Sequence, residues 1–249
     1  MKILSLNCQQ GYNPALKDFL HHLFDAEACD FLLLQEVDEK TLLFLNDPSY
    51  KLVRSFNKET GQDSQLCIAY QEKYFPISTG FKSFASMRKD PISGFKHPAY
   101  GLLWVDFKIE EKRMRIASIH LHSGTDRQVR LNELLVAKKL LLEGVHSSVI
   151  FGGDFNAGFP SERTDMAGVL IPEFMWATSD IGPTLNSRYS ENVPHLPNRI
   201  AAFLSAFGVG IKLRTDHFFI NRESAEDNVV HCLVLPDRVS DHSPIELIV

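Results

Sequence analysis

The chain alternates between short runs of consecutive apolar residues and longer stretches in which apolar residues recur at helical spacing. Runs of about four to eight apolar residues are typical of buried strands, whereas apolar residues three and four positions apart indicate one buried helix face. Residues 3–7 and 31–34 are such runs and predict two strands. Pro14 opens a helical pattern between them, and a second helix is predicted at residues 39–45.

The same alternation continues to the end of the chain. A helix is predicted at residues 126–144, where Gly144 provides a left-handed stop, and a shorter helix at residues 200–207. We expect the proline-rich residues 157–197 to form mostly loops, and Gly152-Gly153 to end the strand before them. Further strands are predicted at residues 51–54, 65–70, 101–108, 113–120, 148–151, 217–220, 229–235 and 245–249.

Strands that alternate with helices favour a mixed α/β fold. No internal repeat or linker divides the 249 residues, so we expect one domain, residues 1–249.

Apolar residues make up 44% of the chain, but no run reaches the roughly 18 consecutive apolar residues of a membrane-spanning helix. The four cysteines are scattered without metal-site spacing, which favours reduced thiols and a cytoplasmic location.

The charge of the chain limits how it could bind nucleic acid. Its net charge of −5 disfavours binding through an overall positive charge. One long connection, residues 81–100, nevertheless carries three lysines and one arginine among phenylalanines and a single acidic residue. A local basic strip therefore stays open as a route to a nucleic acid.

Polar side chains stand where the predicted strands end. A single acidic residue there is most often a turn former or cap, but open α/β sheets also bind ligands at their strand ends. Carboxylates crowded together repel one another unless a cation neutralises them, and oxygen donors suit Mg²⁺ or Mn²⁺. The pattern therefore predicts a divalent-metal site. The strand-end residues are Asn7, Glu36, His120, Asp154, Asp216, Asp241 and His242.

The motifs that contain these residues resemble those of the endonuclease/exonuclease/phosphatase (DNase I-like) superfamily, and they occur in the family's order. This resemblance implies a four-layer α/β sandwich, in which two packed mixed β-sheets are flanked by helices. It also implies hydrolysis of a phosphoric ester with Mg²⁺ or Mn²⁺ as cofactor. The matching segments are Ser5-Leu6-Asn7, Leu34-Gln35-Glu36-Val37, Ser118-Ile119-His120-Leu121, Gly153-Asp154-Phe155-Asn156, Thr215-Asp216-His217 and Ser240-Asp241-His242-Ser243-Pro244.

The resemblance further implies a role for each residue at the metal and at the water. Glu36 and Asp241 would bind the metal, helped by Asn7, which is also a candidate for substrate binding. Asp154 would orient or deprotonate the water that attacks phosphorus in line. Asn156 would hold that water or the phosphate beside it.

Two histidines complete the implied site. His242 would hydrogen-bond a phosphoryl oxygen while Asp216 holds its ring, as an acid commonly fixes a histidine tautomer. His120 would stabilise the transition state or protonate the leaving oxygen. Two positions depart from the family pattern: Ser118 stands where asparagine is common, and His217 where tyrosine or tryptophan is common.

The substrate is less well specified than the chemistry. A nuclease-like phosphodiesterase is the first hypothesis, with Arg188 as a phosphate ligand and Tyr189 as a stacking residue. A lipid (sphingomyelinase-like) phosphoesterase, a small-molecule phosphoesterase and an inactive phosphate-binding module are competing hypotheses. The function of His122 stays open, whereas Arg130 fits a structural salt bridge better than a phosphate contact. The oligomeric state is not predicted.

Overall fold

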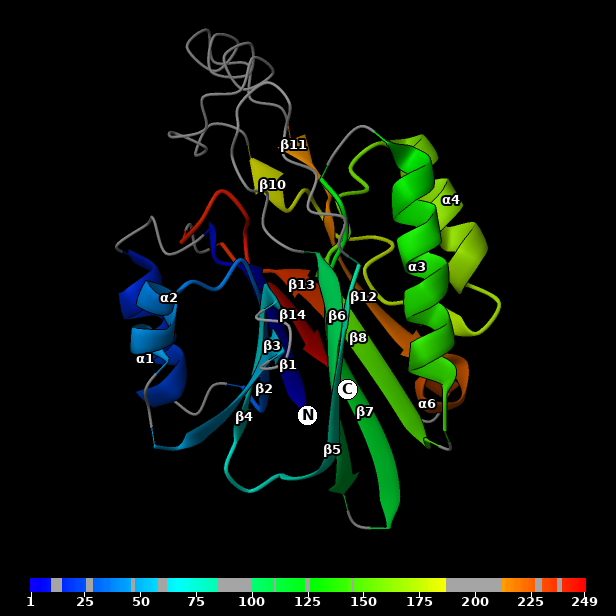
Figure 1. Ribbon diagram of the computed structural model, residues 1–249. Coiled ribbons are helices and arrows are strands. Elements are labelled where there is room, and N and C mark those ends of the chain that lie inside the picture. The colour runs from blue at the N-terminus through cyan, green and yellow to red at the C-terminus, as the bar shows by residue number, and fades with distance from the viewer. Residues whose placement is uncertain are drawn as a thin grey trace, which may run out of the picture.

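Two six-stranded sheets pack face to face in the computed structural model (Figure 1). Among the described residues, no helix is both long and apolar enough to span a membrane. All four cysteine thiols are free. The structure describes residues 1–9, 15–25, 29–45, 48–57, 62–84, 100–109, 111–123, 126–144, 146–186, 212–226, 230–236 and 239–249.

The first sheet has the strand order β13-β14-β1-β2-β4-β3. Its central strands β1 and β2 run parallel, and Asn7 at the end of β1 lies opposite Gln35 at the end of β2. On β2, Phe31 and Leu33 pack between the sheets, whereas Leu32 and Leu34 pack on the opposite face. Burial on both faces explains why this strand is a continuous apolar run. The bounds are β1 (Lys2–Asn7), β2 (Phe31–Gln35), β3 (Tyr50–Asn57), β4 (Gln62–Gln71), β13 (His231–Val234) and β14 (Ile245–Ile248).

The second sheet has the order β5-β6-β7-β8-β12-β9. Here β7 and β8 run parallel, so that His120 lies opposite Asp154, and β12 runs antiparallel to β8, which places Asp216 on the other side of Asp154. A separate two-stranded sheet pairs β10 with β11. The bounds are β5 (Phe75–Ser83), β6 (Gly101–Ile109), β7 (Lys112–His120), β8 (Ser148–Asp154), β9 (Phe174–Trp176), β10 (Leu185–Asn186), β11 (Lys212–Leu213) and β12 (Asp216–Asn221).

Helices cover the outer face of each sheet, which completes the predicted four layers. Figure 1 shows α1 and α2 beside the first sheet and α3, α4 and α6 beside the second. Buried apolar residues of α1 pack on β1 and β2, and those of α3 and α4 pack on β7 and β8. The fold class predicted from the sequence is thereby confirmed. The helix bounds are α1 (Ala15–Asp25), α2 (Glu39–Phe44), α3 (Arg127–Leu142), α4 (Pro160–Leu170) and α6 (Arg222–Glu226).

The sequence prediction was wrong about where β8 ends. The strand does not stop at Gly152-Gly153 but continues to Asp154. Gly153 has a φ of +149°, and a Cβ atom there would lie 1.9 Å from the backbone oxygen of Ile119. The glycine therefore permits a close strand contact that no side chain would allow. With this contact, β8 continues as far as Asp154.

Several elements were not predicted from the sequence, among them β5, α4 and the short strands β9 and β10 within the segment expected to form loops. The edge strand β5 contains Pro76, and its exposed side chains do not alternate in burial, so it lacks the usual strand pattern. The helix α4 lies within the segment predicted to be loop-rich, because Pro160 was interpreted as a loop residue although it occupies the start of the helix. The buried residues Met166 and Leu170, one turn apart, were the available signal. The helix predicted at residues 200–207 lies outside the described residues.

Glu133 on α3 is a buried carboxylate, and it allows a prediction about pH and stability. Its side chain accepts the backbone N–H of His122 at 2.9 Å, and burial raises the pKa of Glu133 to about 7 despite this bond and nearby Arg130. An unfolded glutamate titrates near 4.5, so the folded protein binds this proton more tightly. The contribution of Glu133 to stability therefore falls as the pH rises from about 4.5 to about 7.

Glu133→Gln should remove this pH dependence. Relative to the wild type, the variant's free energy of unfolding is expected to increase by about 2–3 kcal/mol between pH 4.5 and pH 8. Urea unfolding of both proteins at the two pH values measures this difference. A difference that is the same at both pH values would contradict the assignment.

Candidate active site

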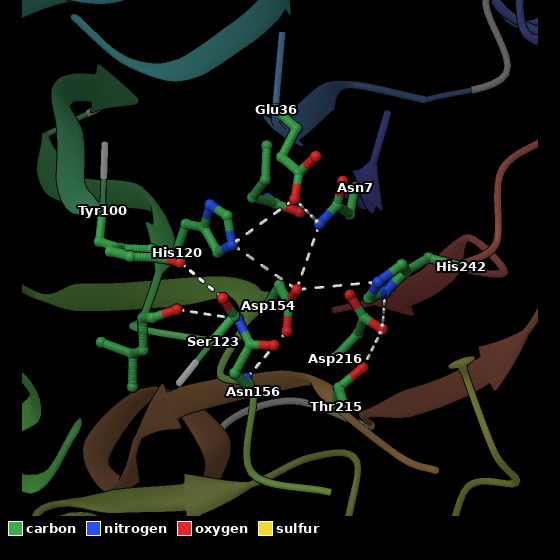
Figure 2. Close-up of polar contacts among 12 residues, drawn as sticks. Asn7, Glu36, Tyr100, His120, Ser123, Asp154, Asn156, Thr215, Asp216 and His242 are labelled. Carbon is green, nitrogen blue, oxygen red and sulfur yellow. Dashed lines mark hydrogen bonds and ion pairs between the residues drawn. The ribbon is translucent and has the colours of Figure 1, made fainter. Parts of the chain in front are cut away.

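The strand directions bring the predicted polar residues to one edge of the two sheets (Figure 2). Asn7 and Gln35 end neighbouring parallel strands of the first sheet, and Glu36 follows immediately with a positive φ of 53°. His120 and Asp154 end neighbouring parallel strands of the second sheet. Since the sheets pack face to face, residues from distant parts of the sequence meet at this edge.

Asp154 lies at the centre of the cluster. Its Oδ2 atom accepts a hydrogen bond from Asn7 Nδ2 at 3.2 Å, and it lies 3.7 Å from His120 Nε2 and 3.8 Å from His242 Nε2. Asn7 Nδ2 also contacts Glu36 Oε1 at 3.1 Å, and His120 Nε2 lies 3.9 Å from that same oxygen. Figure 2 shows these side chains pointing toward one another from both sheets.

The second oxygen of Asp154 is held by the chain that follows it. Asp154 Oδ1 accepts the backbone N–H of Asn156 at 2.8 Å, and Asn156 adopts a positive φ of 50°. Asn156 Nδ2 donates to the backbone oxygen of Leu121 at 2.8 Å. The turn after β8 thus fixes the carboxylate of Asp154 and ties it to the end of β7. Burial is the main cause that raises the pKa of Asp154 to about 7.

His242 and Asp216 form a buried ion pair. His242 Nδ1 lies 2.8 Å from Asp216 Oδ2, which also accepts the hydroxyl of Thr215 at 3.0 Å. Burial disfavours the charged form of both residues, but the attraction between them and their neighbours is stronger. Asp216 and Asp154 raise the pKa of His242 well above its ordinary value. His242 and neighbouring hydroxyls lower the pKa of Asp216. His242 is therefore a cation that presents Nε2 to Asp154.

His120 carries no charge at neutral pH. Burial, followed by the charge of His242, lowers the pKa of His120 to about 3. The ring of Tyr100 contacts His120 edge-on at 4.9 Å between centroids, and the Tyr100 hydroxyl lies 2.6 Å from Ser123 Oγ. Two roles were implied for His120. Its neutral state favours stabilisation of a transition state over delivery of a proton to the leaving oxygen.

The acidic residues form a donor set that fits a hard divalent cation. The Glu36 side chain is 21% exposed, and burial together with the charge of Asp241 raises its pKa. Among the described residues, no lysine or arginine pairs with Glu36, Asp154, Asp216 or Asp241. Asp154, Asp216 and His242 also place ligand atoms within 4.8 Å of one another. The short His242–Asp216 contact makes two members of that group an ion pair. Glu36 and Asp241, the ligands predicted from the sequence, therefore stay the candidates for holding a cation.

Three structural partners of the site were not predicted from the sequence. Tyr100 precedes β6 and covers His120, while the hydroxyl of Thr184 accepts the backbone N–H groups of Thr215 and Asp216, both at 3.1 Å. Ser240 Oγ donates to the backbone oxygen of Asn7 at 2.7 Å and thereby joins the His242 segment to β1. Only Ser240 had a signal, since it directly precedes Asp241 and His242 in their motif.

The remaining candidates are placed as follows. Arg130 pairs with Glu162 and donates to the backbone oxygen of His122 at 3.4 Å, so the structural salt bridge predicted for it is confirmed. The His122 ring packs edge-on against Tyr100 at 5.0 Å, which places it beside His120. Arg188 and Tyr189, predicted as substrate contacts, lie outside the described residues, as do residues 85–99 of the basic connection.

Comparison with known proteins defines the class to which this fold and site belong. The sequence model of the Endonuclease/Exonuclease/phosphatase family matches residues 4–242, nearly the whole length. The chain therefore belongs to this family of phosphoric ester hydrolases. No curated protein matches the sequence.

Several solved structures share the fold. TDP2 from D. rerio, complexed with a single-strand DNA product, is 17% identical with a TM-score of 0.72, covering 99% of this chain and 97% of that chain. A mannosyl-6-phosphatase from Bacteroides thetaiotaomicron is 15% identical with a TM-score of 0.69, covering 100% and 98%. An endonuclease/exonuclease/phosphatase from Bacteroides vulgatus is 15% identical with a TM-score of 0.70, covering 99% and 97%. These likenesses confirm the predicted fold.

Proposed function

We propose that this chain is a divalent-metal-dependent phosphodiesterase that hydrolyses a nucleic acid by in-line attack of a water held by Asp154. The observation that carries the proposal is the convergence on Asp154 Oδ2 of Asn7 Nδ2, His120 Nε2 and His242 Nε2, within 3.2–3.8 Å. A buried carboxylate surrounded in this way can orient a water against a phosphoryl group that the same neighbours bind.

Different side chains would contact the phosphate on the two sides of Asp154. His242, held as a cation by Asp216, would donate through Nε2 to a phosphoryl oxygen and stabilise the charge that develops there. Neutral His120, on the other side of Asp154, would donate to another oxygen of the phosphate. Asn7 bonds both Asp154 and Glu36 and so keeps the two carboxylates at a fixed separation. Glu36 and Asp241 would hold Mg²⁺ or Mn²⁺, which supplies charge neutralisation at a phosphoryl oxygen.

The nuclease-like substrate is supported by the fold shared with TDP2 from D. rerio, whose structure contains a single-strand DNA product. The fold shared with a mannosyl-6-phosphatase favours the competing candidate, a phosphatase for small monoesters. A lipid phosphoesterase and an inactive phosphate-binding module are two further candidate functions. The intact set of Asp154, His242 and Glu36 argues against the inactive module.

Hydrolysis assays separate these candidates. The protein should hydrolyse bis-p-nitrophenyl phosphate with Mg²⁺ or Mn²⁺, and excess EDTA should abolish the activity. Single-stranded and double-stranded DNA, RNA, sphingomyelin and mannose 6-phosphate are then compared at equal metal concentration. Preference for a nucleic acid supports the proposal, preference for the monoester supports the phosphatase, and no turnover with any metal or substrate leaves only the binding module.

Glu36→Ala tests the proposed metal ligand separately from turnover. Because Glu36 supplies a half-buried carboxylate oxygen, its loss should weaken Mg²⁺ binding by at least about tenfold, as losses around a metal site commonly do. Isothermal titration calorimetry with Mg²⁺ measures this. Glu72→Ala is the matched control, since Glu72 is exposed and pairs with Lys51 away from the site. An isotherm unchanged by Glu36→Ala would show that Glu36 does not bind the ion.

A further inference from the structure

A buried polar contact joins the two sheets directly beneath the candidate active site. Gln35, at the end of β2 in the first sheet, donates through Nε2 to Ser118 Oγ on β7 of the second sheet at 3.0 Å. The same NH₂ group donates to Leu33 O at 3.0 Å and also lies 3.3 Å from Ser5 Oγ, so its two hydrogens are shared among three acceptors. Gln35 and Ser118 are both fully buried, with no exposed surface.

The direction of these hydrogen bonds is fixed by the chemistry of the partners. A backbone carbonyl can only accept, so the contact with Leu33 O places the NH₂ group of Gln35 on this side. The Ser118 hydroxyl accepts from that NH₂ group and donates back across the sheets to Leu34 O at 3.4 Å. Ser118 is therefore bonded to β2 in both directions.

This polar contact lies one residue layer below the groups proposed to act on phosphate. Ser118 and His120 are two residues apart on β7 and point to the same face of the strand. Gln35 directly precedes Glu36, where the backbone turns to a positive φ of 53°. The contact thus joins the end of β2, which Glu36 follows, to the end of β7, where His120 lies. The Glu36 carboxylate and the His120 imidazole lie 3.9 Å apart at their closest atoms.

We propose that Gln35 and Ser118 are positioning residues that set the distance between the Glu36 half of the site on the first sheet and the His120 half on the second. The apolar core between the sheets holds them together but is non-directional, whereas hydrogen bonds fix one relative placement. A displacement of about 1 Å at a reacting group can cost roughly 100-fold in rate, so this placement matters for turnover. The inference rests on the proposed function, since it concerns the same site.

Ser118→Ala tests this proposal, because it removes the hydroxyl that bonds the two sheets while keeping a small buried side chain. The matched control is Ser55→Ala, which removes another fully buried hydroxyl, one that accepts the backbone N–H of Leu66 at 3.0 Å within the first sheet. For each variant we would measure kcat and KM on bis-p-nitrophenyl phosphate, the thermal midpoint, and the imidazole NMR signals of His120 in metal-free protein.

We expect Ser118→Ala to lower kcat about tenfold with KM within twofold, as a loss confined to the transition state does, and to shift the His120 signals. Ser55→Ala should lower only the thermal midpoint. If both variants lower the midpoint alike and leave kcat and the His120 signals unchanged, Ser118 is merely structural and the proposal fails. Gln35→Met, which removes the donor from the other side, replaces Ser118→Ala if that variant does not fold.

The NMR measurement separates this inference from the proposed function. If the wild type hydrolyses no phosphate ester, the proposed function fails. The His120 signals in Ser118→Ala and Ser55→Ala still decide whether the contact positions the ring: a shift in Ser118→Ala alone supports the positioning role, and equal or absent shifts overturn it.

Discussion

Asp154→Ala is expected to lower kcat by at least ~100-fold while the protein stays folded. Asp154 is the residue on which Asn7, His120 and His242 converge, so no neighbouring carboxylate occupies its place. Burial disfavours its charge and raises its pKa to about 7, so its removal also relieves a cost to the folded state. Steady-state kinetics on bis-p-nitrophenyl phosphate, with circular dichroism for folding, measures both effects.

Asp180→Ala is the control for this prediction. Asp180 is exposed and accepts the hydroxyl of the neighbouring Ser179 rather than a bond from the residues around Asp154, so its loss should leave kcat within about twofold. A folded Asp154→Ala variant that retains more than a tenth of the wild-type kcat would show that another group orients the attacking water.

His242→Ala is expected to have a similarly large effect on kcat, at least ~100-fold, for a different reason. His242 is the buried cation nearest to Asp154, and Asp216 holds it through a 2.8 Å contact. Its loss would remove the charged donor that we propose contacts the phosphate. It also leaves the buried carboxylate of Asp216 with only neutral donors such as Thr215, so the thermal midpoint should fall as well.

The comparison with His231→Ala separates the role of His242 from a general effect of losing a histidine. His231 is exposed on β13, the edge strand of the first sheet, and its replacement should change neither kcat nor the thermal midpoint appreciably. If His242→Ala lowers the midpoint but leaves kcat near the wild-type value, the ion pair with Asp216 is structural and the proposed contact of His242 with phosphate is wrong.

The fold was predictable from the sequence where burial leaves a clear pattern. The run of Phe31 to Leu34 is apolar at every position because both faces of β2 are covered, and α3 shows a helical repeat that ends before Gly144. The edge strand β5 lacks this signal because its side chains are exposed or half-buried at every position and it contains Pro76. Gly153 suggested an end to β8, although its positive φ in fact allows the strand to pass close to Ile119.

The candidate site was predictable in its members but not in its contacts. Residues such as Asp154 and Glu36 were found because they follow apolar runs within recognisable motifs. Their contacts depend on how the two sheets pack, and no local sequence pattern encodes that packing. Tyr100, just before β6, contacts His120 at the end of β7, and Thr184 bonds the backbone of Asp216 from a distant segment. The charge states of the two histidines likewise follow from burial and from their partners.

A crystal structure of the protein soaked with Mn²⁺ and phosphate, with the ion located by its anomalous scattering, tests most directly whether these side chains form one site. We expect one manganese ion bonded to the Glu36 carboxylate, and a phosphate that contacts the ion, His242 Nε2 and Asp154 together. Manganese bound elsewhere on the chain, or a phosphate that contacts neither residue, would contradict the claim that these side chains form a single phosphoesterase site.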